Sequence, residues 1–168
     1  MKQIIREGVF ETNSSSTHSI CIAVDDSLLN EPDFVHFKLG EFGWDRDRLD
    51  TIEAKASYLY TAIADNYYHE NRQAFEAYLK KIKKFLKEND IECKFDEIVQ
   101  RNDGYCECGY IDHGYELKAF VDLITSSCWR LHRYLFSDKS FILTGNDNND
   151  HDVTFKVNYA HEAYYKGN

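Results

Sequence analysis

The chain contains few of the residues that interrupt secondary structure. Its 168 residues include 1 proline and 8 glycines, which argues against a collagen-like, low-complexity or disordered chain. No run approaches the roughly 18 apolar residues of a membrane-spanning helix, and no basic start followed by an apolar stretch marks a signal peptide. We therefore expect a single globular domain over residues 1–168 that stays in the cytoplasm.

Positive charge is also scarce. The chain carries 20 Lys and Arg against 29 Asp and Glu, which gives a formal net charge of −9 at pH 7. Proteins bind nucleic acids and anionic membranes without sequence specificity through Lys and Arg side chains that neutralise phosphates. The charge balance therefore argues against both of these partners, and it suits either solubility or a protein partner with a basic groove.

Cysteine patterns give no support for a metal centre. The 5 cysteines are an odd number without a signal peptide, which indicates reduced thiols rather than a disulfide framework. Cys106 and Cys108, followed by His113, are the best candidates for zinc ligands. Zinc sites usually separate paired cysteines by two residues, and a gap of one places the side chains on opposite faces of a strand. We predict no metal site, and no known nucleotide or catalytic motif identifies a cofactor.

Aromatic residues are abundant, with 12 Tyr, 11 Phe and 2 Trp, and apolar residues recur with two periods. Short alternating or continuous apolar runs predict strands over residues 4–10, 20–24, 34–39, 91–95, 105–111, 140–144 and 153–157. A turn at 102–104 and a loop at 145–152 predict two hairpins. Steps of three and four residues predict helices over about 50–67, 70–88, 115–125 and 128–136, with a short helix at the end of the chain. The fold class is α+β, a mostly antiparallel sheet covered by about four helices.

The first two predicted helices are amphipathic. Asp50 and Glu53 match a capping box at the start of the first helix. The face of this helix expected to pack on the sheet comprises Ile52, Ala56, Leu59, Ile63 and Tyr67. The outer side of the second helix carries Lys80, Lys81, Lys83, Lys84 and Lys87. This row can meet an anionic partner, although a solvated face with cations toward the C-terminus is the simpler interpretation.

The most unusual stretch is the polar run Phe10-Glu11-Thr12-Asn13-Ser14-Ser15-Ser16-Thr17-His18-Ser19. It lies between two apolar runs, so we expect a polar connection between strands. Its hydroxyl and amide groups can bind an oxyanion or a phosphate, and one serine can act as a nucleophile if a histidine lies within hydrogen-bond distance. The alternative is structural, because Ser and Thr before a strand commonly satisfy backbone groups in turns.

Two further polar stretches, 109–114 and 144–148, also lie at strand ends, where sites are usually built. If the three stretches converge, His18, Asp112 and His113 are candidates to move protons. The candidates for substrate binding are Asn13, Ser14, Ser15, Ser16, Thr17, Asn146 and Asp147. The structural alternatives are that Asp112 caps the following helix and that residues 145–152 form an ordinary hairpin loop. That loop lacks the sixth-position glycine of a calcium loop.

A fourth stretch, Gly40-Glu41-Phe42-Gly43-Trp44-Asp45, combines two glycines with two aromatic and two acidic residues. The glycines allow sharp bends or the close approach of another group, and the aromatic rings are suited to cover an edge of the core. A structural cap is the simpler interpretation. If the stretch forms the wall of a site, Glu41 and Asp45 are the residues that matter.

These stretches together resemble a family of small uncharacterised proteins from bacteriophages and prophages of Gram-positive bacteria. The resemblance rests on Arg6, Gly8, the run 10–19, and the stretches 40–44, 109–113 and 144–148. It covers most of the chain, and the run 10–19 is its most specific part. It implies a phage setting inside a bacterial host cell and a site at the polar stretches, but no particular reaction. Cys106 and Cys108 do not belong to the family pattern, which further disfavours zinc.

Two functional hypotheses of different classes follow. The first is a small enzyme, a hydrolase or transferase, that acts on a phosphate-bearing or nucleotide-like substrate, so that its partner is a small anionic ligand. The second is a non-enzymatic accessory protein that binds and inhibits a host protein, in anti-defence or host takeover, through an acidic surface. An enzyme needs the polar residues around one concavity, whereas an inhibitor needs a contiguous exposed acidic or aromatic patch.

Overall fold

A computed structural model describes residues 16–23, 31–45, 47–100, 106–112, 117–146 and 161–167. Within these ranges the chain forms four helices and ten strands. The helices are α1 (Ile52–Tyr67), α2 (Arg72–Glu88), α3 (Leu117–Thr125) and α4 (Cys128–Phe136). The strands are β1 (Ser16–Ala23), β2 (Phe34–Phe37), β3 (Glu41–Phe42), β4 (Arg48–Leu49), β5 (Glu92–Phe95), β6 (Val99–Gln100), β7 (Cys106–Glu107), β8 (Tyr110–Ile111), β9 (Phe141–Asn146) and β10 (His161–Gly167). The predicted α+β class with four helices is confirmed.

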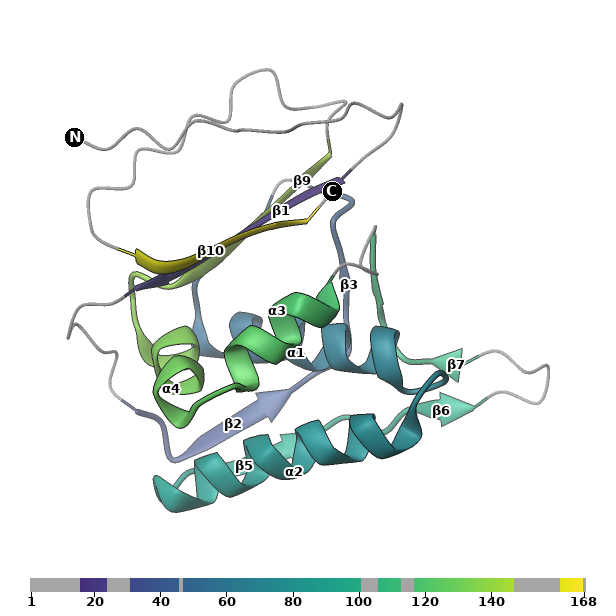
Figure 1. The fold of residues 1–168 in the computed structure, drawn as a ribbon. Coiled ribbons are helices and arrows are strands. Elements are labelled where there is room, and N and C mark those ends of the chain that lie inside the picture. Colours follow the sequence, from purple (N-terminus) through teal and green to yellow (C-terminus); the bar gives the residue numbers. More distant parts are fainter. Residues whose placement is uncertain are drawn as a thin grey trace, which may run out of the picture.

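The largest sheet is antiparallel and has the order β10-β1-β9-β4. Its central strand β1 carries the buried run Ile20, Cys21 and Ile22, and a continuous apolar run is typical of a strand with neighbours on both sides. β1 pairs with β9 from Ser16 opposite Asn146 to Cys21 opposite Phe141. In Figure 1, β10, β1 and β9 cross the upper part of the molecule above α3, α1 and α4, while α2 lies at the bottom beside β5.

Two short strand pairs are parallel, which the sequence analysis did not predict. β2 pairs with β5 across α1 and α2, and β3 pairs with β8 across a still longer connection. Parallel strands need a long crossover rather than a hairpin, so no local turn signal announces them. β6 and β7 are antiparallel on either side of the predicted turn at 102–104, which itself lies outside the described residues. The single returning strand predicted over 105–111 is wrong, because it is divided into β7 and β8, and β8 pairs with β3.

Helix α1 lies at the centre of the fold and is buried on nearly all sides. Tyr58, Leu59 and Ile63 are fully buried, and so are the polar side chains of Lys55 and Thr61. We expected one apolar face against the sheet, but α1 contacts β2 and β8 as well as α2, α3 and α4. A helix that is enclosed on most sides is buried beyond one apolar stripe. The spacing of apolar residues in the sequence therefore indicates only part of the surface that α1 buries. Its N-cap is Thr51, which accepts a hydrogen bond from the Ala54 amide, rather than the predicted Asp50.

Hydroxyl groups of α1 also fix the backbone next to β3. The Lys38 amide donates to Ser57 Oγ at 3.2 Å, and the Gly40 amide donates to Thr61 Oγ1 at 3.1 Å. Gly109 packs against Gly40: an added Cβ at Gly109 would lie 2.8 Å from the Gly40 carbonyl oxygen. The φ of Gly109 is +72°. The strand pair β3-β8 is therefore held closely against α1.

Two predicted boundaries are wrong. Ser16 to Ser19 belong to β1 rather than to a polar connection, because β9 pairs with all four of these residues and β10 pairs with His18 and Ser19. The end of the chain, His161–Gly167, is a strand rather than a helix. Glu and Ala favour a helix locally, but pairing with an open strand edge outweighs weak propensity. The predicted strands over 4–10 and 153–157 lie outside the described residues.

No helix in the described ranges is both long enough and apolar enough to cross a membrane. The helices instead cover a core that includes Val35 and Phe37 of β2, Phe120 of α3 and Leu135 of α4. Rings within this core make edge contacts, such as those between Tyr58 and Phe120, which suit the quadrupoles of aromatic side chains. The aromatic richness of the sequence is therefore largely used in packing.

A buried lysine ties α1 to α4. Lys55 is 0% exposed, and its Nζ donates to the carbonyl oxygens of Ser137 at 2.7 Å and Ser140 at 3.1 Å. Tyr134 returns a hydrogen bond to the Lys55 carbonyl at 2.7 Å. Ser137 is the C-cap of α4, so the ammonium group lies at the negative end of that helix. Burial lowers the pKa of Lys55 to about 8, although the charges of Asp50 and Asp138 oppose this effect.

The first prediction concerns the pH dependence of stability. Because the folded pKa of Lys55 is lowered to about 8, the unfolded chain holds more protons between about pH 8 and 10.5, and stability from this group rises with pH in that window. We expect the free energy of unfolding of wild type, relative to Lys55→Met, to increase by about 2–3 kcal/mol from pH 7 to pH 10. Urea unfolding of both proteins at the two pH values measures this difference. An equal difference at both values would contradict the lowered pKa.

Candidate functional site

Parts of all four polar stretches are joined beside α1. His18 in β1 lies opposite Thr144 in β9, and its Nε2 lies 2.9 Å from the carbonyl oxygen of Asp112, just after β8. The fourth stretch is present as well, because Thr144 Oγ1 donates to the Asp45 carbonyl at 2.9 Å. Segments near residues 18, 45, 112 and 144 are thus joined directly by hydrogen bonds.

The imidazole of His18 is enclosed at this junction. It is 0% exposed, and its Nδ1 lies 3.0 Å from the hydroxyl of Tyr58 in α1. A carbonyl oxygen only accepts hydrogen bonds, so Nε2 carries the proton that it donates to Asp112. In the neutral ring, Nδ1 then accepts the proton of the Tyr58 hydroxyl. This arrangement ties β1 to α1 and to the end of β8.

Gly43 provides the space for the His18 ring. Its φ is +103°, and an added Cβ would lie 3.0 Å from His18 Nε2 and 3.0 Å from Asp112 Cβ. Both the backbone conformation and the close approach require glycine here. The predicted role of the glycines in stretch 40–45 is confirmed at Gly43, which allows the close approach of His18 and Asp112.

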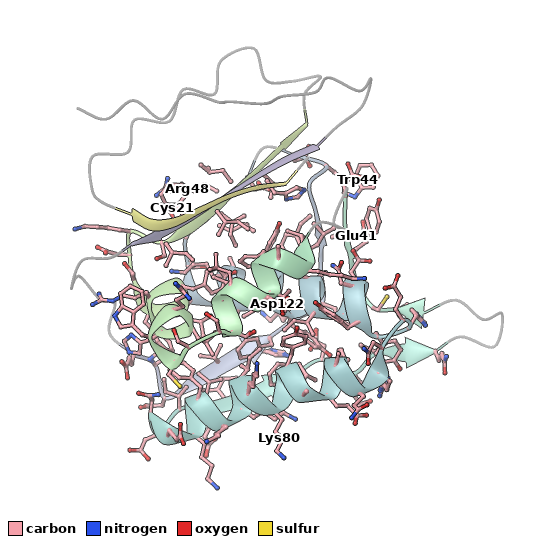
Figure 2. The ribbon with its side chains drawn as sticks, viewed as in Figure 1. Cys21, Glu41, Trp44, Arg48, Lys80 and Asp122 are labelled. Atoms are coloured by element: carbon pink, nitrogen blue, oxygen red, sulfur yellow. The ribbon has the colours of Figure 1, made fainter. Side chains whose placement is uncertain are left out.

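An exposed aromatic pair lies directly outside this junction. Trp44 is 52% exposed and Tyr110 is 42% exposed, and their ring centroids are 5.9 Å apart. Glu41 pairs with Tyr110 in the parallel register of β3 and β8, and Figure 2 shows Glu41 and Trp44 on the same side of the molecule. We call Glu41, Trp44, Asp45, Tyr110 and Asp112 the Trp44 patch.

Carboxylates set the electrostatics of the Trp44 patch. The Tyr110 hydroxyl donates to Asp112 Oδ1 at 3.1 Å. Partial burial, this hydrogen bond and the charges of Asp112 and Asp65 together raise the pKa of Tyr110. Glu41 and Asp45 are exposed. The patch therefore combines two large rings with three carboxylates, and the phenol at its centre stays protonated at neutral pH.

The loop after β3 that carries Trp44 is anchored on the large sheet. Besides the bond from the Thr144 hydroxyl to Asp45, the Asp47 amide donates to Thr144 Oγ1 at 3.3 Å and the Thr144 amide donates to the Asp47 carbonyl at 3.0 Å. The aromatic pair is thus presented by backbone that is fixed on both sides.

The predicted site residues are only partly within the described chain. His18 and Asp112 are brought together, but through the Asp112 carbonyl rather than its carboxylate. Ser16 and Thr17 lie in β1 opposite Asn146 and Gly145, so these segments are neighbours through their backbones. The structure does not describe the remaining candidates, Asn13, Ser14, Ser15, His113 and Asp147. The catalytic and substrate-binding roles stay predictions.

The described residues offer little for metal binding. None of their His, Cys, Asp and Glu side chains form a group of three or more that could hold a metal ion. Cys21, Cys93 and Cys128 are free thiols. Burial raises the pKa of Cys21 to about 12, although Arg48 opposes it, so this thiol is unreactive.

Sequence reasoning missed two groups that the fold brings together. Tyr58 was absent from the expected apolar face of α1, yet its hydroxyl lies within hydrogen-bond distance of His18.

The second group is His36 in β2, whose Nε2 lies 2.7 Å from Oδ1 of Asp96, the residue that follows β5. Asp96 Oδ2 also accepts from the Leu39 amide at 3.1 Å. Burial tends to raise the pKa of Asp96, but hydrogen bonds from Leu39 and His36 and the charges of His36 and Lys94 lower it. The two residues are 60 positions apart and are brought together by the parallel pairing of β2 with β5, so no local sequence pattern indicates their contact.

Comparison with known proteins adds no identification. No family model matches the chain, and neither a curated protein nor a solved structure is similar enough to be matched.

The second prediction compares two tyrosines at this junction. Tyr58→Phe removes the buried hydroxyl that donates to His18, and we expect it to lower the free energy of unfolding by about 1–3 kcal/mol. Tyr110→Phe removes an exposed hydroxyl bonded to Asp112, and we expect a loss of less than about 1 kcal/mol. Urea unfolding of the two matched variants checks this order. Equal small losses would show that the His18 contact does not support the fold.

Proposed function

We propose that the protein is a binding protein that recognises a basic surface of a protein partner through the Trp44 patch. The observation that carries the proposal is the exposed Trp44 and Tyr110 pair, which is framed by carboxylates and supported from below by a buried histidine. This is the accessory-protein hypothesis, now attached to particular residues.

The aromatic pair has the properties of an interface anchor. Trp and Tyr supply most of the energy of many interfaces, and rigid side chains lose little entropy on binding. Trp44 and Tyr110 are about half exposed, and their rings already contact each other. The hydrogen bonds of Thr144 to residues 45 and 47 hold the supporting loop in place before a partner arrives.

Charge complementarity selects the partner. Glu41 pairs with Tyr110, Asp112 accepts a hydrogen bond from Tyr110, and Asp45 follows Trp44 in the chain, while the whole chain carries −9. Lys and Arg on a partner would be attracted by this field and could stack on the exposed rings. Phosphate groups would be repelled. In the phage setting that the family resemblance implies, such a partner is a host protein, and covering its basic surface would inhibit it.

The third prediction tests the Trp44 patch with a matched tryptophan. Proteins captured from bacterial host lysate by wild type should be lost or bound about tenfold more weakly by Trp44→Ala. Trp129→Ala is the control, because Trp129 in α4 is similarly exposed at 43% but lies outside the patch. Quantitative mass spectrometry of the captured proteins, followed by calorimetry with the enriched one, measures the effect. Partners that are kept by Trp44→Ala and lost by Trp129→Ala would refute the proposal.

The enzyme hypothesis remains a second candidate because the polar stretches do meet. A hydrolase or transferase would use the junction of residues 18, 112 and 144 to bind a phosphate-bearing substrate. The enclosure of His18 weighs against it, since a proton carrier must reach its substrate. Both ring nitrogens of His18 already lie within hydrogen-bond distance of Tyr58 and Asp112.

The fourth prediction separates the two candidates. Because His18 is enclosed, we expect nucleotides, inorganic phosphate and divalent cations to shift the melting temperatures of wild type and His18→Ala equally, or not at all. Differential scanning fluorimetry across this panel gives the answer. A compound that stabilises wild type but not the variant would favour the enzyme, and turnover of that compound would be measured next.

A further inference from the structure

The outer face of α2 carries a concentration of positive charge that an acidic protein does not need for solubility. Arg72 and five lysines stand against Glu76 and Glu88, a net +4 for the helix, which leaves −13 for the rest of the chain. The five lysines, Lys80, Lys81, Lys83, Lys84 and Lys87, are all exposed. We call them the lysine stripe.

The lysine stripe disfavours the helix that carries it. Lys80 precedes Lys83 and Lys84 by three and four residues, and Lys87 follows them by four and three. Side chains at these spacings are neighbours on a helix surface, and like charges there repel. Attraction to the helix dipole is confined to the last turn and does not account for Lys80 or Lys81. A helix face with alternating positive and negative side chains would be solvated equally well.

The cations of the stripe are largely available. Lys84 Nζ lies 3.7 Å from Glu88, while no carboxylate in the described chain lies within 4.0 Å of the ammonium groups of the other four. Lys81 lies over the Tyr78 ring and Lys83 over the Phe95 ring, with Nζ 5.6 Å and 5.2 Å from the centroids. These ring contacts orient two ammonium groups without neutralising them.

Acidic residues limit the length of the stripe. Glu76 lies before it, and Glu88, Asp90 and Glu92 follow it, all of them exposed. From Lys80 to Lys87 the helix rises about 10 Å. A long nucleic-acid duplex or a membrane plane would extend beyond this length onto carboxylates, within the ~8 Å over which charges act at physiological salt. The stripe has no arginine for bidentate phosphate contacts.

We propose that the lysine stripe of α2 is a second docking surface, and that its occupant is a short acidic segment of a protein. Such a segment is small enough to stay on the stripe and complements its charge. Figure 2 shows Lys80 at the bottom of the molecule, away from Trp44 and Glu41 at the upper right. The protein can therefore hold a basic partner at one surface and an acidic segment at the other, and the two proposals stand or fall separately.

The test uses the full chain and a fluorescein-labelled oligoglutamate peptide at low salt, measured by fluorescence anisotropy. Wild type binds the peptide, and Lys80→Glu/Lys84→Glu weakens binding by about tenfold or more. Lys and Glu have similar helix propensity, so the helix is retained. The control is Lys38→Glu/Lys118→Glu, which makes the same change in net charge at exposed lysines that lie 3.5 Å and 2.7 Å from Glu53 and Glu70. It changes binding by less than about twofold.

Three results would overturn the proposal. If wild type does not bind the peptide at low salt, the stripe is not a docking surface for acidic segments. Equal losses in the two double variants, with unfolding transitions unchanged, show that net charge rather than the stripe attracts the peptide. Tighter binding of a long duplex DNA or of phosphatidylserine vesicles than of the peptide, lost with the same two lysines, assigns the stripe to a phosphate-bearing partner.

Discussion

The enclosure of α1 is the constraint on which the rest of the structure depends. The helix is covered by β2, β8 and the other three helices, so every polar group on it needs a partner inside the protein. Lys55 finds carbonyl groups near the end of α4, Tyr58 finds His18, and Thr61 finds the Gly40 amide. Each of these bonds fixes a different neighbouring segment. The polar side chains of a central helix thereby determine how the surrounding loops and strands are placed.

The Trp44 patch is a consequence of that placement. Gly43 approaches His18 closely, which is itself held by Tyr58, and this close packing turns the next side chain, Trp44, outward beside Tyr110. The segment of Gly43 and Trp44 thus contacts the buried polar junction on its inner side and carries part of the exposed aromatic pair on its outer side. The histidine contributes rigidity to a surface, and the surface carries the proposed function.

The distribution of charge divides the molecule into regions of opposite sign. Carboxylates gather around Trp44 and Tyr110, while α2 presents five lysines. Salt at physiological concentration screens electrostatic interactions beyond ~8 Å. A partner at either surface is therefore affected by the charges of that surface rather than by the net charge of −9. The two proposed docking surfaces therefore differ in sign, so that each would repel the ligand proposed for the other.

Local patterns determined the α+β class, the exact span of α4, the positions of the other helices to within a few residues and the row of lysines on α2. Helix periodicity, caps and turn residues act within a few positions, so the sequence alone carries them. Tertiary structure alone decided the parallel pairs β2-β5 and β3-β8, the strand at 161–167, the contact of His36 with Asp96 and the burial of His18. These features depend on partners that lie far apart in the chain, and no short-range signal encodes such a pairing. The polar residues near 18, 112 and 144 could be identified as unusual from their composition, but only the packing around α1 showed that His18 faces inward and Trp44 outward.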